Sequence, residues 1–359
     1  MTMRLVVIFC VALVAGAARA EPYTWNLPDW LDPPRVPADN PMTAEKVELG
    51  RRLFYELNLA GPSYMSCATC HDPAQAFTDG RPVAVGITGE FHPRNSIALQ
   101  NVAYQSVFTW ADPATVSLEQ QMATPMFGQH PEEMAITGYE ARVLDYLKHD
   151  PIYPGLFAAA YPETSGDIDF DAVIKAIASF ERTLVSADAP YDRYRYGGDR
   201  AALSEAARRG ADLFNGERLG CANCHGGLHL SDAIPEPRFH NTGLYNLDGA
   251  GALPSGNQGL IEHTGRPEDM GKFRTPSLRN VALTAPYMHD GSLATLDAVI
   301  DHYAAGGEAA RTGMRSPLAS PLVPGFEISD DEKADLIAFL ESLTDETFLS
   351  NLDHQSPFR

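Results

Sequence analysis

The sequence predicts a mainly α-helical protein made of two lobes with long wrapping loops. Apolar residues recur at helical spacing in several segments, alternating strand patterns are scarce, and a helix followed by a cysteine pair occurs twice. A chain of 359 residues is too long for one small core and suits two domains. The helical patterns follow Thr43 as far as Leu57 and recur at 139–148, 169–186, 204–215, 294–305 and 329–343.

The first twenty residues predict a signal peptide. A short basic start is followed by the apolar run 5–14 and by the small-residue cleavage pattern Ala18-Arg19-Ala20. We expect a mature chain that begins at Glu21 and is exported to the periplasm. The apolar run is shorter than the roughly 18 residues that a membrane helix needs, so no membrane anchor is expected.

Residues 21–40 are rich in proline and predict an extended arm. Thr43 is the expected cap of the first helix, and Ser329, followed by three acidic residues, is the expected cap of the last. The boundary between the lobes is expected within 186–199. This gives an N-terminal lobe 21–190 and a C-terminal lobe 191–359.

Gly- and Pro-bearing loops fill much of the remaining chain, at 72–96, 226–276 and 306–326. Loops of this length are expected to wrap something other than a continuous apolar core. The formal net charge of −20 makes nucleic acid an unsuitable partner. The acidity either only keeps an exported protein soluble or steers a basic partner, and the sequence leaves both readings open.

All four cysteines after residue 20 lie in two Cys-x-x-Cys-His motifs. In such a motif two thioether bonds fix a haem and the histidine binds its iron. The sequence therefore predicts two covalently bound c-type haems, one in each of two cytochrome c-like lobes. The motif residues are Cys67, Cys70, His71, Cys221, Cys224 and His225.

Two other uses of these cysteines fit less well. A structural zinc site needs four ligands close together, whereas the two pairs are far apart in the sequence and each is followed at once by histidine. A thioredoxin-like pair would need a βαβ context, which the pattern does not provide. The remaining axial ligand of each iron decides between electron transfer and peroxide chemistry, and the spacing does not identify it.

Beyond the haem motifs, the chain resembles the di-haem cytochrome c peroxidases and MauG over nearly all of its mature length. The segments that carry the resemblance are 93–96, Trp110, Pro125-Met126, Glu133-Met134, 273–280 and 283–291. Segments 40–42 and 239–246 are most similar to the methanobactin-associated branch. The resemblance implies a mostly helical fold with haem 1 in the N-terminal lobe, haem 2 in the C-terminal lobe, and a calcium ion and a tryptophan between them.

Carried over to this sequence, the resemblance makes Trp110 the inter-haem tryptophan and Glu133 the acid over haem 1, with Gln121 in the same pocket. Other peroxidases of the family place a removable histidine ligand at the position of Ile87, so haem 1 is expected to be open. His92 is an alternative ligand, or else a polar surface group. Trp110 could equally be a core aromatic residue and Glu133 a solvated glutamate.

On haem 2 the resemblance implies Tyr303 as the second axial ligand, at a position where the conventional peroxidases of the family have methionine and MauG has tyrosine. A phenolate lowers the potential and stabilises oxidised iron. The alternative is that Tyr303 is a packed side chain and that Met288 or His302 binds the iron. Calcium is implied at Asn95, Thr284 and Pro286, whose side-chain and backbone oxygens suit this ion; Asn95 could instead be a turn residue.

The implied function is oxidation by hydrogen peroxide. Both haems would share a high-valent, bis-Fe(IV)-like state, which oxidises aromatic residues of a secreted partner protein over a distance. In the methanobactin-associated branch that partner binds copper and a tryptophan becomes kynurenine. Leu219 replaces a surface tryptophan that MauG uses as the exit for electron holes, so another route is needed, through Trp25, Trp30 or a tyrosine.

Two other functions stay open. One is a di-haem peroxidase that reduces hydrogen peroxide with electrons from a small cytochrome or cupredoxin. The other is an electron carrier without enzymatic activity, for which both irons would need strong ligands on both sides. The implied phenolate Tyr303 argues against the first, and the open pocket with Glu133 against the second.

Overall fold

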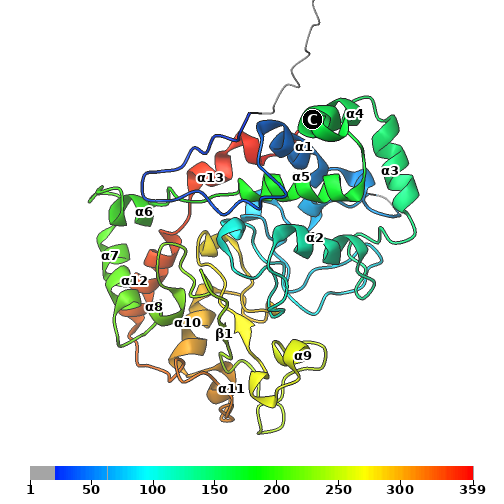
Figure 1. Ribbon diagram of the computed structural model, residues 1–359. Helices are drawn as coiled ribbons and strands as arrows, with labels where there is room; N and C mark the ends of the chain where they lie inside the picture. The colour runs from blue at the N-terminus through cyan, green and yellow to red at the C-terminus, as the bar shows by residue number, and fades with distance from the viewer. Residues whose placement is uncertain (1–20, 63, 359) are drawn as a thin grey trace, which may run out of the picture.

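The computed structural model describes residues 21–62 and 64–358 and is mainly helical, as predicted. The signal-peptide expectation lies outside the described residues. The helices are α1 (Ala44–Phe54), α2 (Leu118–Phe127), α3 (Glu140–His149), α4 (Tyr153–Ala160), α5 (Phe170–Arg182), α6 (Pro190–Arg195), α7 (Glu205–Asn215), α8 (Ala222–His225), α9 (Ile261–Thr264), α10 (Leu296–Ala304), α11 (Glu308–Arg311), α12 (Asp330–Glu341) and α13 (Glu346–Ser350) (Figure 1).

Strand structure among the described residues is slight. Two-residue strands β1 (Phe239–His240) and β2 (Phe273–Arg274) pair antiparallel, with Phe239 opposite Arg274. The other short elements are 3-10 helices at Leu57–Leu59, Cys67–Thr69, Pro73–Gln75, Val102–Tyr104, Pro162–Thr164, Pro267–Asp269, Val281–Leu283 and Leu352–His354. No helix in the described part of the chain is long and apolar enough to cross a bilayer.

The helices expected from periodicity all form, and their caps are the expected residues. The Thr43 hydroxyl accepts the Lys46 amide at 3.2 Å, and Ser329 forms a capping box with Glu332. The helix expected at 169–186 ends earlier, at Arg182. Helices α2 and α4 were not predicted, because α2 contains Pro125 and α4 is short and apolar without a clear polar face.

Two buried apolar clusters organise the fold. The first is built around the crossing of α1 and α5, and the second around the crossing of α7 and α12 (Figure 1). A glycine lies at each crossing: a Cβ on Gly50 would meet the Ala176 oxygen at 1.9 Å, and a Cβ on Gly210 would meet the Asp335 oxygen at 1.9 Å. A helix with a glycine precedes each cysteine pair in the sequence. In both helices the glycine is needed because the backbone of the partner helix lies too close for a side chain.

The C-terminal end of the chain returns to the N-terminal half. Phe348 of α13 is 3% exposed and belongs to the first cluster, although it lies within the predicted C-terminal lobe. Figure 1 shows α13 next to the N-terminal helix α1. The chain therefore crosses between the two clusters twice, once after α5 and once before α13.

A buried carboxylate, that of Asp345, joins the two segments in which the chain passes from one apolar cluster to the other. Asp345 is 1% exposed, and its Oδ2 accepts hydrogen bonds from the Ser186 hydroxyl at 3.0 Å and from the Ala187 and Asp188 amides at 2.9 Å. Burial opposes the charge on Asp345, but these hydrogen bonds outweigh it and lower its pKa. Asn280 adds to the network, donating to the Ser186 hydroxyl and accepting the Asp345 amide.

Replacing Asp345 by alanine should lower the free energy of unfolding by about 3 kcal/mol, because it leaves the buried donors of residues 186–188 without an acceptor. Urea unfolding of the haem-loaded protein measures this. Asp353→Ala removes an exposed carboxylate near the same end of the chain and should change stability by no more than about 0.5 kcal/mol. Equal effects of the two variants would contradict a joining role for Asp345.

Candidate functional site

One continuous cavity of about 560 Å³ lies between the two clusters and is lined by residues of both halves. It brings together every site residue predicted from the sequence. From the two cysteine motifs it is lined by Cys67, Cys70, His71, Cys221, Cys224 and His225, and from other segments by Asn95, Trp110, Gln121, Glu133, Thr284, Pro286 and Tyr303.

The first motif presents its histidine to the cavity with a fixed orientation. Cys67 begins a 3-10 helix, and the chain then turns back through Ala76 and Phe77, both with positive φ. The Phe77 carbonyl oxygen lies 2.9 Å from His71 Nδ1. A carbonyl can only accept, so Nδ1 carries the proton and Nε2 is left as a lone-pair donor, which is the form that binds iron.

The second motif repeats this arrangement. Cys224 and His225 lie in the single-turn helix α8, and His225 Nδ1 donates to the Leu230 carbonyl oxygen at 3.3 Å. Burial lowers the pKa of both His71 and His225, which favours the neutral imidazole. The donor set and its orientation at both motifs therefore fit a haem with an axial histidine.

The cysteine thiols do not have the character of a redox pair. Burial raises the pKa of Cys70 to about 11 and that of Cys221 to about 11. Reactive cysteine pairs need a lowered pKa, because the thiolate is the nucleophile. Buried thiols that face a large cavity are consistent instead with covalent attachment of haem.

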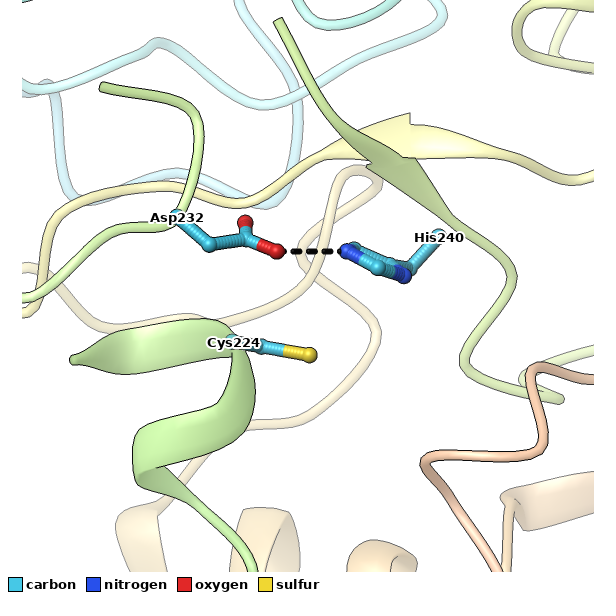
Figure 2. Close-up of side chains that lie close together, drawn as sticks. All are labelled: Cys224, Asp232 and His240. Carbon is cyan, nitrogen blue, oxygen red and sulfur yellow. Dashed lines mark hydrogen bonds and ion pairs between the residues drawn. The ribbon is translucent and has the colours of Figure 1, made fainter. Parts of the chain in front are cut away.

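A polar group beside the second motif was not predicted from the sequence. Figure 2 shows the sulfur of Cys224 pointing toward an ion pair of Asp232 and His240, whose Oδ2 and Nε2 are 2.8 Å apart. The hydrogen bond to Asp232 raises the pKa of His240 to about 9, so the pair is charged at neutral pH. Because Cys224 forms a thioether in a c-type motif, we assign this group to the surroundings of haem 2 and not to a separate metal centre.

Glu133 lies over the first motif in a polar corner of the cavity. Burial raises its pKa to about 7. Its Oε1 is 3.9 Å from Nε2 of His92, and the other ring nitrogen of His92 accepts the Arg94 amide at 3.1 Å. The His92 proton is therefore on Nε2 and faces the carboxyl group. The Ile87 amide donates to the Glu133 carbonyl oxygen at 3.0 Å, which holds the same loop against this residue.

Trp110 links the two halves through backbone contacts. Its indole Nε1–H donates to the Asn95 carbonyl oxygen at 2.8 Å, and the Asn95 amide donates to the His289 oxygen at 2.8 Å. The Asn95 side-chain nitrogen donates to the Arg81 oxygen at 2.7 Å, so its oxygen is left as an acceptor. That oxygen and the backbone oxygens of Thr284 and Pro286 are hard donors of the kind that calcium binds.

Tyr303 lies on α10, and burial raises its pKa strongly. Of the two alternative ligands, Met288 also lines the cavity, whereas His302 lies outside the lining residues. The Nδ1 of His302 accepts the Glu308 amide at 2.9 Å, which points to a structural role for this ring. Leu219, where the resemblance led us to look for a surface tryptophan, is 7% exposed and lines the cavity.

Arg274 is a site residue that the sequence did not reveal. It is 3% exposed and lines the cavity, and it donates to the Thr109 carbonyl oxygen at 3.0 Å and to Gln105 Oε1 at 2.9 Å. No carboxylate pairs with it in the part of the chain that the structure describes. A buried cation needs a counter-charge, so Arg274 fits the carboxylates of a haem.

Comparisons with known proteins agree with this geometry. The family model "Di-haem cytochrome c peroxidase" matches residues 44–201, and the model "Cytochrome c" matches residues 207–344. The chain is 36% identical to the cytochrome-c peroxidase IdrP1 of Denitromonas iodatirespirans, over 93% of this chain and 91% of that protein. It is 38% identical to the methylamine utilization protein MauG of Methylorubrum extorquens, over 86% and 80%.

A crystal structure described as a MauG-like protein associated with microbial copper homeostasis is 47% identical, with a TM-score of 0.90 over 94% of this chain and 100% of that one. The likeness therefore includes both haem motifs and the helices that carry them. On these grounds the chain belongs to the di-haem cytochrome c peroxidase and MauG family, and it is a peroxide-dependent oxidoreductase with two c-type haems.

Proposed function

We propose that this protein is a MauG-type oxidase, which uses hydrogen peroxide to oxidise a tryptophan of a secreted, copper-binding partner protein without direct contact between that residue and iron. The main support is the position of Tyr303, a phenol in the haem 2 part of the cavity where an electron-accepting haem would need a soft ligand. The likeness to a MauG-like protein associated with copper homeostasis supports the class of partner.

The haems supply the redox chemistry, since they store the two oxidising equivalents that peroxide delivers. The chain's own residues control protons and orientation. Burial raises the pKa of Glu133 to about 7, so its carboxyl group exchanges a proton near neutral pH and is suited to move a proton between the peroxide oxygens. Gln121, on the cavity-facing side of α2, would hold peroxide or water beside it.

His225 and Tyr303, which both line the cavity, are the residues that would hold the iron of the second haem. The phenol is protonated in the absence of metal, because burial raises its pKa, and an iron ion favours the phenolate. Trp110 would connect the two haems electronically, and calcium at Asn95, Thr284 and Pro286 would fix the backbone that its indole contacts.

Export to the periplasm is part of the same proposal. It is supported by the pattern of residues 1–20 and by the covalent haem motifs, which are typical of exported cytochromes. A periplasmic enzyme would meet a secreted partner in the same compartment. The acidic surface would attract a basic face of that partner.

The second candidate function is reduction of peroxide with electrons from a small cytochrome or cupredoxin. The observation in its favour is the likeness to IdrP1, which has a similar identity to this chain as MauG has, 36% against 38%, and covers more of the chain, 93% against 86%. This function needs a haem 2 of high potential, and a phenolate ligand would lower that potential.

One experiment separates the two. The ferric protein is mixed with stoichiometric peroxide, without reductant, and followed by optical and Mössbauer spectroscopy. A long-lived state with oxidising equivalents on both irons supports the oxidase. A reaction that begins only after one haem is reduced, and that a reduced cytochrome accelerates, favours the peroxidase and contradicts our proposal.

We expect the rate of the peroxide reaction to rise with pH through about 7, because only the ionised form of Glu133 accepts the proton of peroxide. Glu133→Gln should slow the reaction by about a hundredfold or more and abolish this pH dependence. Stopped-flow traces over a pH series measure both effects. The neighbouring variant Glu132→Gln serves as the control and should keep the wild-type profile; a wild-type profile in Glu133→Gln would exclude this residue from the mechanism.

Tyr303→Met should raise the reduction potential of haem 2 and prevent the state in which both irons are oxidised, because a thioether replaces an anionic ligand. Redox titration and the stoichiometric peroxide experiment measure these changes. His302→Gln and Met288→Leu test the alternative ligands and should leave the haem 2 spectrum unaltered. If one of them changes that spectrum and Tyr303→Met does not, the ligand assignment is wrong.

A further inference from the structure

We propose that Tyr245 and Asp290 form a redox-active site, in which Tyr245 takes over an electron hole from Trp110 and passes its phenolic proton to Asp290. The inference rests on the proposed oxidase function and adds the residue that carries oxidising equivalents away from the haems. It also answers the question raised by Leu219, which leaves this chain without the surface tryptophan of MauG.

The contact between the two side chains is short. The Tyr245 hydroxyl donates to Oδ2 of Asp290 at 2.5 Å, and the other carboxylate oxygen accepts the Ser292 amide at 3.1 Å. A phenol becomes a strong acid when it loses an electron, so its oxidation is easiest where a base already holds its hydrogen bond. Asp290 is such a base, and the proton needs to move only within this hydrogen bond.

Tyr245 shares an apolar cluster with Trp110. Both Trp110 and Tyr245 pack against the same buried cluster, which consists of Ala111, Leu253 and Phe273. The ring of Phe273 stacks on His289, the residue before Asp290, with centroids 3.6 Å apart. An electron can therefore pass from Tyr245 to Trp110 through side chains in van der Waals contact.

Three other tyrosines with hydrogen-bonded hydroxyls lack either a proton acceptor or packing on the cluster of Trp110. The Tyr287 hydroxyl donates to the Val281 carbonyl oxygen, which cannot take a proton. Tyr146 and Tyr153 donate to Glu56, but they lie in or against the first cluster, around α1 and α5, and do not pack against the cluster of Trp110. In the described part of the chain, Tyr245 alone combines a carboxylate acceptor with packing on the Trp110 cluster.

The site is close to the surface. Tyr245 is half-buried, and Leu247, two residues further along, is 61% exposed. The residue between them, Asn246, holds this part of the chain in place: it donates to the Met314 oxygen at 3.0 Å and accepts the Gly251 amide at 2.8 Å. A hole on Tyr245 would be within reach of a partner bound at this loop, on an ordered part of the surface.

The step is balanced in electrons and protons. Peroxide is the oxidant: its reduction to water takes two electrons, one of which the haems would supply and the other Trp110, which becomes its radical cation. One electron then passes from Tyr245 to Trp110, and one proton passes from the Tyr245 oxygen to Asp290 Oδ2. The products are neutral Trp110, a neutral Tyr245 phenoxyl radical and a protonated Asp290, so the total charge is unchanged.

The test uses the full haem-loaded protein, frozen after reaction with one equivalent of hydrogen peroxide and examined by electron paramagnetic resonance and Mössbauer spectroscopy. We expect a tyrosyl radical signal that narrows when the protein contains ring-deuterated tyrosine. Tyr245→Phe should remove this signal, and Asp290→Asn should remove it or shift it, because the proton acceptor is lost. Tyr146→Phe, which removes a phenol bonded to a different carboxylate, is the matched control and should retain the signal.

The outcomes distinguish this inference from the function on which it rests. If both irons become oxidised but no tyrosyl signal forms, or if the signal persists in Tyr245→Phe, the Tyr245 assignment is wrong and the oxidase function stands. If the wild-type protein never stores oxidising equivalents on both irons, the proposed function itself fails. Loss of the signal in Tyr245→Phe, with the iron signals intact, supports the assignment.

Discussion

Buried hydrogen bonds of Asp345 tie together the two segments in which the chain passes between its apolar clusters, and so constrain how the two halves sit on either side of the cavity. The chain passes between its two large apolar clusters after α5 and again before α13. The Asp345 carboxylate, in the second of these segments, accepts hydrogen bonds from residues 186–188 in the first. Neither cluster encloses the cavity alone, since its lining comes from both. A carboxylate buried this deeply is stable only while its donors stay in place, so the junction tolerates little change in the angle between the two halves.

The two halves share the same helix packing and the same orientation of the proximal histidine, but they differ in the other residues that line the cavity. Gly50 and Gly210 permit the same close helix crossing, and each proximal histidine donates to a carbonyl five or six residues later. The opposite sides of the cavity differ. Glu133 provides an ionisable acid near the first motif, whereas the residue presented to the second is a phenol, Tyr303. In the proposed function the first repeat would bind peroxide and the second would store charge, since Glu133 exchanges its proton near neutral pH whereas burial favours the neutral phenol of Tyr303 in the absence of metal.

Trp110 and Tyr245 differ in the group that accepts their hydrogen bond. Trp110 donates to a backbone carbonyl, which holds the indole but cannot remove its proton. Tyr245 donates to a carboxylate, which can. Under the proposed function, an aromatic residue of the first kind would suit fast electron exchange between the haems, and one of the second kind would suit a longer-lived radical near the surface.

The sequence by itself determined the features that are local in the chain. Haem attachment needs five consecutive residues, and the helices follow from apolar spacing and from caps such as Thr43 and Ser329, so both could be predicted. The roles of Glu133, Trp110 and Tyr303 came from resemblance and remain predictions. Only the tertiary structure brought Arg274 to the cavity, His92 to Glu133, and Asp290 to Tyr245. The partners in each contact are far apart in the sequence and carry no periodic pattern. His92 meets Glu133 within the N-terminal half, Tyr245 meets Asp290 within the C-terminal half, and Arg274 reaches Gln105 across the two halves.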